Sequence, residues 1–376
     1  MSKPEGDNLK GAWLAAYYAL QRGVSFALYV LPNRKRANFI CDIEGRPAVS
    51  DRTFSIVPWR GAFKDRVIIR DTIGASEFIA HLPEESQGRQ PDYTPWDHST
   101  DKLVYKGQVV SAIDLLTEIG LGKIVLSRTK YTDCSARKDL YFAYVYALQQ
   151  MCDFCPETLR YIYFTPETGC WMAATPELLL NYNREGGFSH TMALAGTRKR
   201  TYSDDLDNWD EKNQYEHNIV ADVILDSLEH LGVKSIEERE NMIKTGSVEH
   251  LCHDIRFKAE GVSAEKILDT LSPTPALGGF PREIALQFLD YYELHPRRCY
   301  GGYVVIDDKD LLAYVNLRCA NVGQSGYCIY AGGGITADSK SESEWEETEL
   351  KAQTIESFLN IGFNITSLKY GSQQEG

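Results

Sequence analysis

A run of acidic residues near the C-terminal end of the chain is the first candidate for chemistry. Residues 342–352, ESEWEETELKA, contain five glutamates and one lysine. On a helix, where each residue advances about 100°, Glu344, Glu347 and Lys351 lie beside the apolar stripe. The remaining acids face solvent on the opposite side: Glu342, Glu346 and Glu349. Because a buried carboxylate without a partner is costly, the inner pair needs a cation or several hydrogen bonds.

A second inward-facing acid is Glu216, within a predicted helix that follows Asp210. It lies three and four residues before Ile219 and Val220, on the apolar side of that helix. Such a glutamate is either the boundary residue of an amphipathic helix or a buried ligand. Together with the inner acids of residues 342–352 it would form an all-oxygen donor set, which suits Mg²⁺ better than zinc.

Three more charged residues stand in apolar strand patterns, and each has two interpretations. Arg318, in LLAYVNLRC, is predicted to face away from the core as a surface charge or as a bidentate clamp for a carboxylate. Lys123, the first residue of KIVLSRTK, is either a charge on an edge strand or a general base whose pKa is lowered by desolvation. Glu177, directly after Pro176, is either a charge at the end of a strand or a general acid whose pKa is raised.

Glycine-rich segments complete the set of candidates: ALAGT (193–197), PTPALGGFPR (273–282) and AGGGIT (331–336). Each is either a simple turn or a place where backbone N–H groups approach an anion closely. None of them matches the phosphate loop or the dinucleotide fingerprint, so the sequence gives little support for nucleotide binding.

The elements that must position these residues follow no regular βαβ alternation. Helices are predicted in VVSAIDLLTEIGLG, KDLYFAYVYALQQMC, DEKNQYEHNIVADVILDSLEHLG and residues 341–361. CYGGYVVID, LLAYVNLRCA and GYCIYAGG are predicted to be consecutive strands of an antiparallel meander. Runs of strands interrupted by helices favour an α+β fold, and the polar residues 85–101 are the best linker candidate.

The composition narrows the function classes. The 376 residues carry a net charge of −13, which makes nucleic acid and anionic membranes poor partners. No run approaches the length of a membrane span and no signal pattern begins the chain, so we expect a soluble cytoplasmic protein. Nine cysteines indicate reduced thiols. Cys152 and Cys155 have metal spacing, but no second pair completes a zinc site.

Ten sequence blocks, taken together and in order, resemble the chorismate-utilising enzyme family. This family includes isochorismate synthase, salicylate synthase, anthranilate synthase component I and aminodeoxychorismate synthase. The blocks are KIVLSR, TPELLL, ALAGTR, EKNQYEHNIV, EHLCHDI, PTPALGGFPR, YGGYVV, NLRCA, AGGGI and SESEWEETELKA. The resemblance assigns residues 101–370 to the chorismate-binding catalytic region and residues 1–100 to a weakly matched N-terminal part of the fold.

The resemblance implies a single large α+β domain with central antiparallel β-sheets, helices packed outside, and Mg²⁺ as cofactor. Glu216 and Glu347 match the metal carboxylates of the family, with Glu344 close by or acting through water. Arg318 matches the residue that grips the enolpyruvyl carboxylate of chorismate. The other residues implied to bind the substrate are Gly196, Thr197, His250, Ala276, Leu277, Tyr300, Gly332, Gly334 and Lys351.

A few positions indicate the branch of the family. Members that activate water keep a lysine where Lys123 stands, and Ala195 disfavours the aminodeoxychorismate synthases. Ala276 followed by Leu277 resembles isochorismate synthases, whereas salicylate synthases tend to have threonine at the first of these positions. The resemblance therefore implies isomerisation of chorismate to isochorismate, with Lys123 as general base and Glu177 as general acid.

Alternatives remain open within and outside this branch. A salicylate synthase would also eliminate pyruvate, and a non-catalytic anion-binding relative would show no turnover. The absence of fused carrier or lyase segments favours a menaquinone pathway over a siderophore pathway, and a monomer is expected. Two departures from the family pattern, Val305 for a glycine and His253 for serine or threonine, affect the expected pocket shape and rate.

Overall fold

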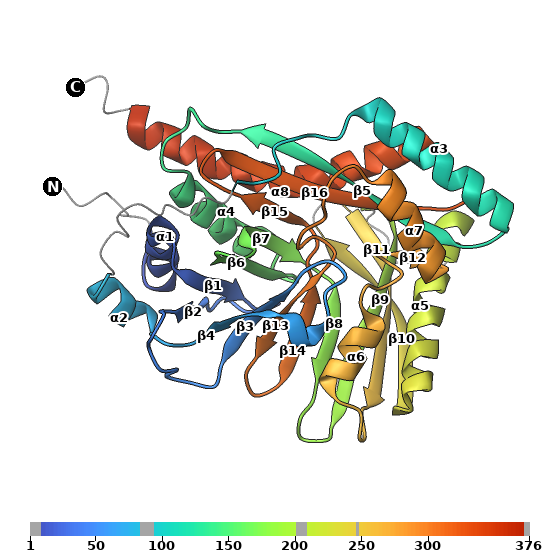
Figure 1. The fold of residues 1–376 in the computed structure, drawn as a ribbon, viewed down its shortest axis with the longest axis horizontal. Helices are drawn as coiled ribbons and strands as arrows, with labels where there is room; N and C mark the ends of the chain where they lie inside the picture. Colours follow the sequence, from blue (N-terminus) through green and yellow to red (C-terminus); the bar gives the residue numbers. More distant parts are fainter. Residues whose placement is uncertain (1–8, 83–93, 201–208, 246–247, 372–376) are drawn as a thin grey trace.

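Two eight-stranded antiparallel sheets form the centre of the structure (Figure 1). The computed structural model describes residues 9–82, 94–200, 209–245 and 248–371. The predicted α+β fold with central antiparallel sheets is confirmed. Part of the predicted linker at residues 85–101 lies outside the described residues, and the predicted division at residue 100 stays a prediction.

The first sheet has the strand order β12-β5-β16-β15-β7-β6-β1-β2. All neighbouring strands in it are antiparallel. Its strands are β1 (Ser25–Val30), β2 (Asn38–Asp42), β5 (Lys123–Asp133), β6 (Leu159–Thr165), β7 (Gly169–Thr175), β12 (Gly279–Phe280), β15 (Cys319–Val322) and β16 (Gly326–Ile335).

The second sheet has the order β10-β11-β9-β8-β14-β13-β3-β4 and is antiparallel as well. Strands from the first hundred residues thus occur in both sheets. The strands of this sheet are β3 (Thr53–Val57), β4 (Val67–Arg70), β8 (Leu178–Tyr182), β9 (Phe188–Lys199), β10 (Lys234–Thr245), β11 (Val248–Lys258), β13 (Tyr303–Asp307) and β14 (Leu311–Val315).

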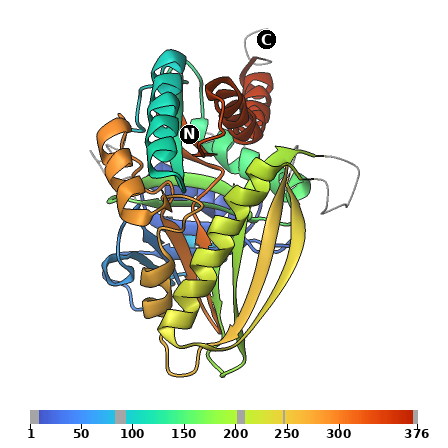
Figure 2. The same ribbon diagram turned by 90° about the vertical axis from the view of Figure 1, so that its right-hand side faces the viewer.

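Helices cover the outer faces of both sheets. In the first sheet, α1, α4 and α8 pack on one part and α3 and α7 on another, while α5 and α6 cover the second sheet (Figure 2). The helices are α1 (Ala12–Arg22), α2 (Ala75–Ala80), α3 (Lys102–Ile119), α4 (Leu140–Phe154), α5 (Glu211–Leu231), α6 (Ala264–Leu271), α7 (Arg282–Tyr292) and α8 (Ser341–Gly371), with a 3₁₀ turn η1 (Phe63–Asp65).

An aromatic core fills the space between the two sheets. Along β6, Tyr161 and Tyr163 point into this core, whereas Ile162 points to the helices α1, α4 and α8. Val304 on β13 joins the same inner core from the second sheet. This alternation follows from the two-residue period of a strand, and it gives the protein a helix–sheet–sheet–helix layering.

The helices that carry candidate residues begin and end as the sequence indicates. The Asp210 side chain caps α5 by accepting from the backbone N–H of Asn213, and Gly232 ends the helix in the left-handed region with φ 78°. Asp101 and Gly120 cap α3 in the same way; this helix ends at the predicted glycine but begins at Lys102, before the predicted segment VVSAIDLLTEIGLG. α8 begins at Ser341, as predicted, and continues beyond the predicted end at residue 361.

The predicted three-stranded meander over residues 299–333 is wrong. β13 pairs with β14 in the second sheet, whereas β15 pairs with β16 in the first. The chain crosses between the sheets after Val315, where Arg318 has a φ of 46°. Arg318 is therefore a buried crossover residue and not the outward-facing strand residue predicted. A bulky residue in the left-handed region is uncommon and often marks a functional site.

The two sequence departures lie in ordinary strand positions. Val305 is buried on β13 between Ala313 and Ser55 of the neighbouring strands. His253 on β11 accepts or donates a hydrogen bond of 2.9 Å to His217. All nine cysteines are unbonded to one another, and no helix among the described residues is long and apolar enough to cross a membrane.

Candidate active site

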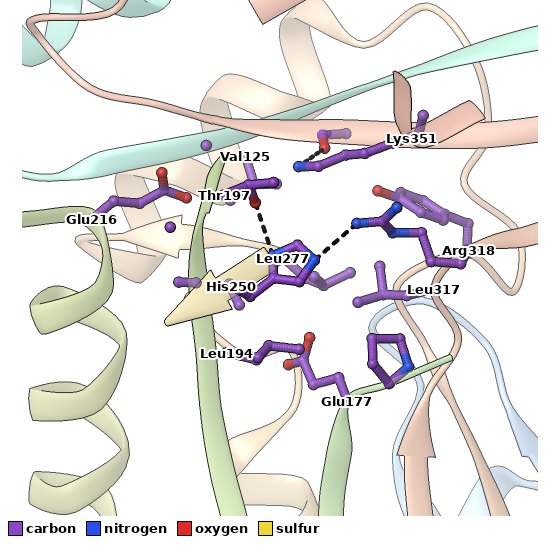
Figure 3. A pocket seen from close by; sticks show the side chains of 18 of the residues that line it. Val125, Glu177, Leu194, Thr197, Glu216, His250, Leu277, Leu317, Arg318 and Lys351 are labelled. Carbon is purple, nitrogen blue, oxygen red and sulfur yellow. Dashed lines mark hydrogen bonds between the residues drawn. The ribbon is translucent and has the colours of Figure 1, made fainter. Parts of the chain in front are cut away.

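A pocket lies where the two sheets meet, beside the crossover at Arg318 (Figure 3). Strands β5 and β16 of the first sheet and β9 and β11 of the second sheet contribute to its walls, and α5 and α8 each add one side chain. The lining residues are Lys123, Val125, Pro176, Glu177, Leu194, Ala195, Gly196, Thr197, Glu216, His250, Ala276, Leu277, Tyr300, Leu317, Arg318, Tyr330, Ala331, Gly332, Gly334 and Lys351.

The structure brings together all ten residues that were predicted to bind substrate, and with them Lys123, Glu177 and Glu216. Glu344 and Glu347 do not line the pocket. Sequence reasoning missed several apolar or small lining residues and one tyrosine, Tyr330. Strand alternation would have found two of them, since Val125 lies two residues after Lys123, and Tyr330 two residues before Gly332.

Lys123 and Glu216 form a buried ion pair. The Lys123 side chain is 1% exposed, and its Nζ lies 2.8 Å from Oε1 of Glu216. Burial opposes ionisation of Glu216, but Lys123 and Lys212 outweigh it and hold the pKa of Glu216 below its ordinary value. Glu216 is therefore ionised, and its carboxylate holds the Lys123 nitrogen through this contact.

The surroundings of Glu177 favour its protonated form. It is buried at the start of β8, and burial raises its pKa to about 8, although nearby Lys123 and a hydrogen bond from Thr274 oppose the shift. Figure 3 shows Glu177 and Glu216 on different sides of His250. At neutral pH Glu177 is thus a protonated acid that faces the pocket and can donate its proton.

Arg318, His250 and Thr197 form a hydrogen-bonded chain along one wall of the pocket (Figure 3). Arg318 Nη2 lies 3.1 Å from His250 Nε2, and His250 Nδ1 lies 3.0 Å from Thr197 Oγ1. A guanidinium can only donate, so Nε2 must accept and Nδ1 must carry the ring proton. Thr197 then accepts from His250, which leaves its own hydroxyl proton available for a ligand.

This chain predicts one protonation state for His250. Burial, together with the charges of Arg318 and Lys351, holds the pKa of His250 well below its ordinary value. A ¹⁵N-edited NMR spectrum at pH 7 is expected to show the neutral ring with its proton on Nδ1. An imidazolium, or a proton on Nε2, would contradict the chain. Arg318→Met is expected to remove this tautomer preference, because it removes the donor to Nε2.

Arg318 also offers a donor that no protein group uses. Arg318 is only 9% exposed, and burial lowers its pKa, which reflects the cost of keeping the charge away from water. Among the described residues, Nη1 is buried without a hydrogen-bond partner. A buried guanidinium with an open N–H is a strong binding site for an anion such as a carboxylate.

Each predicted metal carboxylate faces its own lysine. The pairs are Lys123–Glu216 at 2.8 Å, Lys212–Glu344 at 2.8 Å and Lys351–Glu347 at 2.6 Å. Glu344, Glu216 and Glu347 all raise the pKa of Lys212, although burial opposes them. Within the part of the chain that the structure describes, no three acidic, histidine or cysteine side chains stand close enough to form a ready-made metal site.

The donor set nevertheless fits a hard divalent cation. Glu344 is 2% exposed; its Oε1 accepts hydrogen bonds from Lys212 and Ser339, and its Oε2 is buried with no partner. Burial raises the pKa of Glu344, as does nearby Glu347, although Lys212 opposes them. Because an orphaned buried carboxylate oxygen is costly, a cation with oxygen ligands, such as Mg²⁺, would satisfy it.

The expectation that the outer acids of α8 meet only solvent is wrong in part. Glu346 is exposed, but the exposed Glu342 contacts Lys102 and Lys106, and Glu349 forms an ion pair with the buried Arg128. The pattern of a single helix could not show these partners, because they come from α3 and β5.

The lack of a side chain at Gly334 leaves room for the carboxylate of Glu216. A Cβ atom at Gly334 would lie 2.1 Å from Glu216 Oε1, which no real contact allows. Gly334→Ala is therefore expected to displace this carboxylate and to weaken Mg²⁺ binding, measured by calorimetry, about tenfold or more. Gly107→Ala on α3, where a Cβ meets nothing within 4 Å, is the matched control. Equal Mg²⁺ affinity in both variants would contradict this placement of Glu216.

The comparisons with known proteins agree with this geometry. Isochorismate synthase MenF of Escherichia coli strain K12 is 28% identical over 316 residues, which cover 80% of this chain and 70% of that protein. Isochorismate synthase MenF of Bacillus subtilis strain 168 is 33% identical over 216 residues, 53% of this chain and 44% of that protein.

A solved structure shares the fold almost end to end. The structure of MenF, the menaquinone-specific isochorismate synthase from Escherichia coli, superposes with a TM-score of 0.71 at 21% identity. The alignment covers 96% of this chain and 93% of that one. Residues 68–360 match the family described as chorismate binding enzyme. This range includes all the residues that line the pocket. The predicted family is thus confirmed, and the chain belongs to the chorismate binding enzymes.

Proposed function

We propose that this protein is an isochorismate synthase, an isomerase that converts chorismate to isochorismate. The observation that carries the proposal is that Lys123 and the protonated Glu177 line one pocket, beside the buried, partly unpaired Arg318. A candidate base, an acid and an anion-binding group are the three parts that addition of water to an anionic substrate requires. The names of the two MenF relatives support the same reaction.

In the proposed reaction, water attacks C2 of chorismate while the hydroxyl group leaves from C4. For this role Lys123 would act as the neutral amine, released from Glu216, and would accept a proton from the attacking water. As the C2–O bond forms, the two ring double bonds shift and the C4–O bond breaks. Glu177 donates its proton to the departing hydroxyl, which leaves as water. One water is consumed and one is released, so the net change is an isomerisation.

Three donors that line the pocket would hold the substrate. Arg318 Nη1 has no protein partner and would bind the enolpyruvyl carboxylate. The hydroxyl proton of Thr197, which His250 leaves free, would be donated to an oxygen of the ring substituents. Lys351 already contacts the carbonyl oxygen of Gly332 at 2.9 Å, so its ammonium is held at the edge of the pocket.

Mg²⁺ is the proposed cofactor, and Glu216, Glu344 and Glu347 are the residues that would hold it. Bound there, the ion would supply positive charge for the ring carboxylate and would compete with Lys123 for the Glu216 oxygen. The orphaned Oε2 of Glu344 is the feature of this chain that supports a cation at this place.

A salicylate synthase is the second candidate, since it would add the elimination of pyruvate. Ala276 and Leu277 line the pocket in this chain, and this pair resembles isochorismate synthases. Incubation of the purified protein with chorismate and Mg²⁺ separates the two functions. Isochorismate without pyruvate is expected. Pyruvate and salicylate in equal amounts would overturn the choice, and no consumption of chorismate would support a non-catalytic relative.

Menaquinone biosynthesis is the proposed pathway. Its support is the two relatives named MenF, at 28% and 33% identity, since the structure of the Escherichia coli MenF is described as menaquinone-specific. Nine unpaired cysteines, eight of them buried, suit a reducing compartment such as the cytoplasm. We propose a monomer with chorismate as its small-molecule partner, and size-exclusion chromatography with light scattering would test the oligomeric state.

A further inference from the structure

Lys212 has no part in the proposed reaction, yet it lies next to the acids that would hold the metal. It stands one turn before Glu216 on α5, and its Nζ lies 2.8 Å from Oε1 of Glu344. Burial disfavours its charge, but the charges of Glu344, Glu216 and Glu347 outweigh burial and raise the pKa of Lys212. Lys212 therefore places its side-chain nitrogen against Glu344 from the same helix that carries Glu216.

The contribution of Lys212 is its charge more than its hydrogen bond. Oε1 of Glu344 accepts a second hydrogen bond of 2.7 Å from the hydroxyl of Ser339. Ser339 is buried and its own backbone N–H is bonded to Thr336, so it holds Glu344 in place independently of α5. Loss of Lys212 would thus leave the carboxylate oriented but would remove the positive charge beside it.

We propose that Lys212 is an internal counter-cation that sets the affinity of this site for its divalent ion. The inference rests on the proposed function, since it takes Glu216, Glu344 and Glu347 as the metal-binding acids. A fixed positive charge beside these acids repels an incoming divalent cation and competes with it for Glu344. The same charge compensates buried carboxylates, which would otherwise be costly to hold together.

Calorimetric titration with Mg²⁺ alone, without chorismate, tests this role. Lys212→Met keeps the apolar stem of the side chain but removes the charge, and its Kd for Mg²⁺ is expected to be about tenfold lower than that of the unsubstituted protein. Lys212→Gln, which keeps a donor for Glu344, is expected to bind more tightly as well. Lys212→Arg keeps the charge and is expected to stay within about twofold of the unsubstituted protein.

Lys130→Met is the matched control for these variants. Lys130 also pairs with a carboxylate at 2.8 Å, that of Glu356, and it is partly exposed like Lys212, but it does not line the pocket. This control is expected to leave the Mg²⁺ affinity unchanged. A general loosening of the structure would weaken binding in any variant, so tighter binding confined to Lys212→Met and Lys212→Gln is the specific result.

Two results would overturn the proposal. One rejects the role of Lys212 alone, and the other also rejects the metal-binding role of the three acids. Equal or weaker Mg²⁺ binding by both uncharged variants, with measurable binding by the unsubstituted protein, would reject the role of Lys212 alone. Absence of Mg²⁺ binding by the unsubstituted protein and by every variant would reject the metal assignment as well. Conversion of chorismate by the unsubstituted protein is measured separately, so the proposed reaction is judged on its own.

Discussion

Lys123→Ala is expected to lower kcat for isochorismate formation by about a thousandfold or more, because it removes the only base proposed for the attacking water. The variant also leaves Glu216 without its 2.8 Å partner. Mg²⁺ binding is expected to persist, since loss of a competing cation does not remove a carboxylate. The measurement is kcat by product analysis at saturating chorismate and Mg²⁺.

Two comparisons keep this result specific to the chemistry. Lys130→Met, outside the pocket, is expected to retain activity. The unfolding temperature of Lys123→Ala shows whether the fold survives the loss of a buried ion pair. Undiminished isochorismate formation by a folded Lys123→Ala would remove this lysine from the mechanism.

Glu177→Gln is expected to lower kcat by about a hundredfold to ten-thousandfold, because the amide cannot donate a proton to the leaving hydroxyl. The pH dependence carries the more specific signature. With a raised pKa of about 8, Glu177 is protonated below that pH and loses its proton above it. The rate of the unsubstituted protein should therefore fall as pH rises through about 8.

This fall in rate above pH 8 is expected to disappear in Glu177→Gln, because the carboxyl group that causes it has been replaced by an amide. Kinetics between pH 6 and 10 on both proteins would measure this difference. A Glu177→Gln variant that keeps full activity, or that keeps the fall above pH 8, would show that another group donates the proton.

Much of the fold could be predicted from local sequence signals. The capping of α5 by Asp210 and Gly232 and the start of α8 at Ser341 follow from residue types within one turn of each end. The α+β class followed from runs of strands interrupted by helices, whereas the central antiparallel sheets were implied by the family resemblance. The meander failed because nothing in LLAYVNLRCA reveals that the chain changes sheets at Arg318, a residue type that rarely takes a positive φ.

The candidate site was predicted better by resemblance than by pattern. Periodicity alone left an ordinary and a functional interpretation open for Glu216, Lys123 and Arg318, because burial depends on which elements pack together. The lysine partners of the metal carboxylates were missed for the same reason: Lys212 and Glu344 are 132 positions apart in sequence. The Lys351–Glu347 pair, which spans a single helical turn, is the one that helix spacing could have shown.

The most direct test of the proposed chemistry is the origin of the hydroxyl oxygen in the product. Reaction of chorismate with the purified protein and Mg²⁺ in H₂¹⁸O is followed by mass spectrometry of the isochorismate formed. If a solvent water attacks C2 while the C4 hydroxyl leaves, every product molecule from a single turnover carries one ¹⁸O at C2. Isochorismate with only ¹⁶O at C2 would mean that the original hydroxyl migrates, and it would contradict the proposed roles of Lys123 and Glu177.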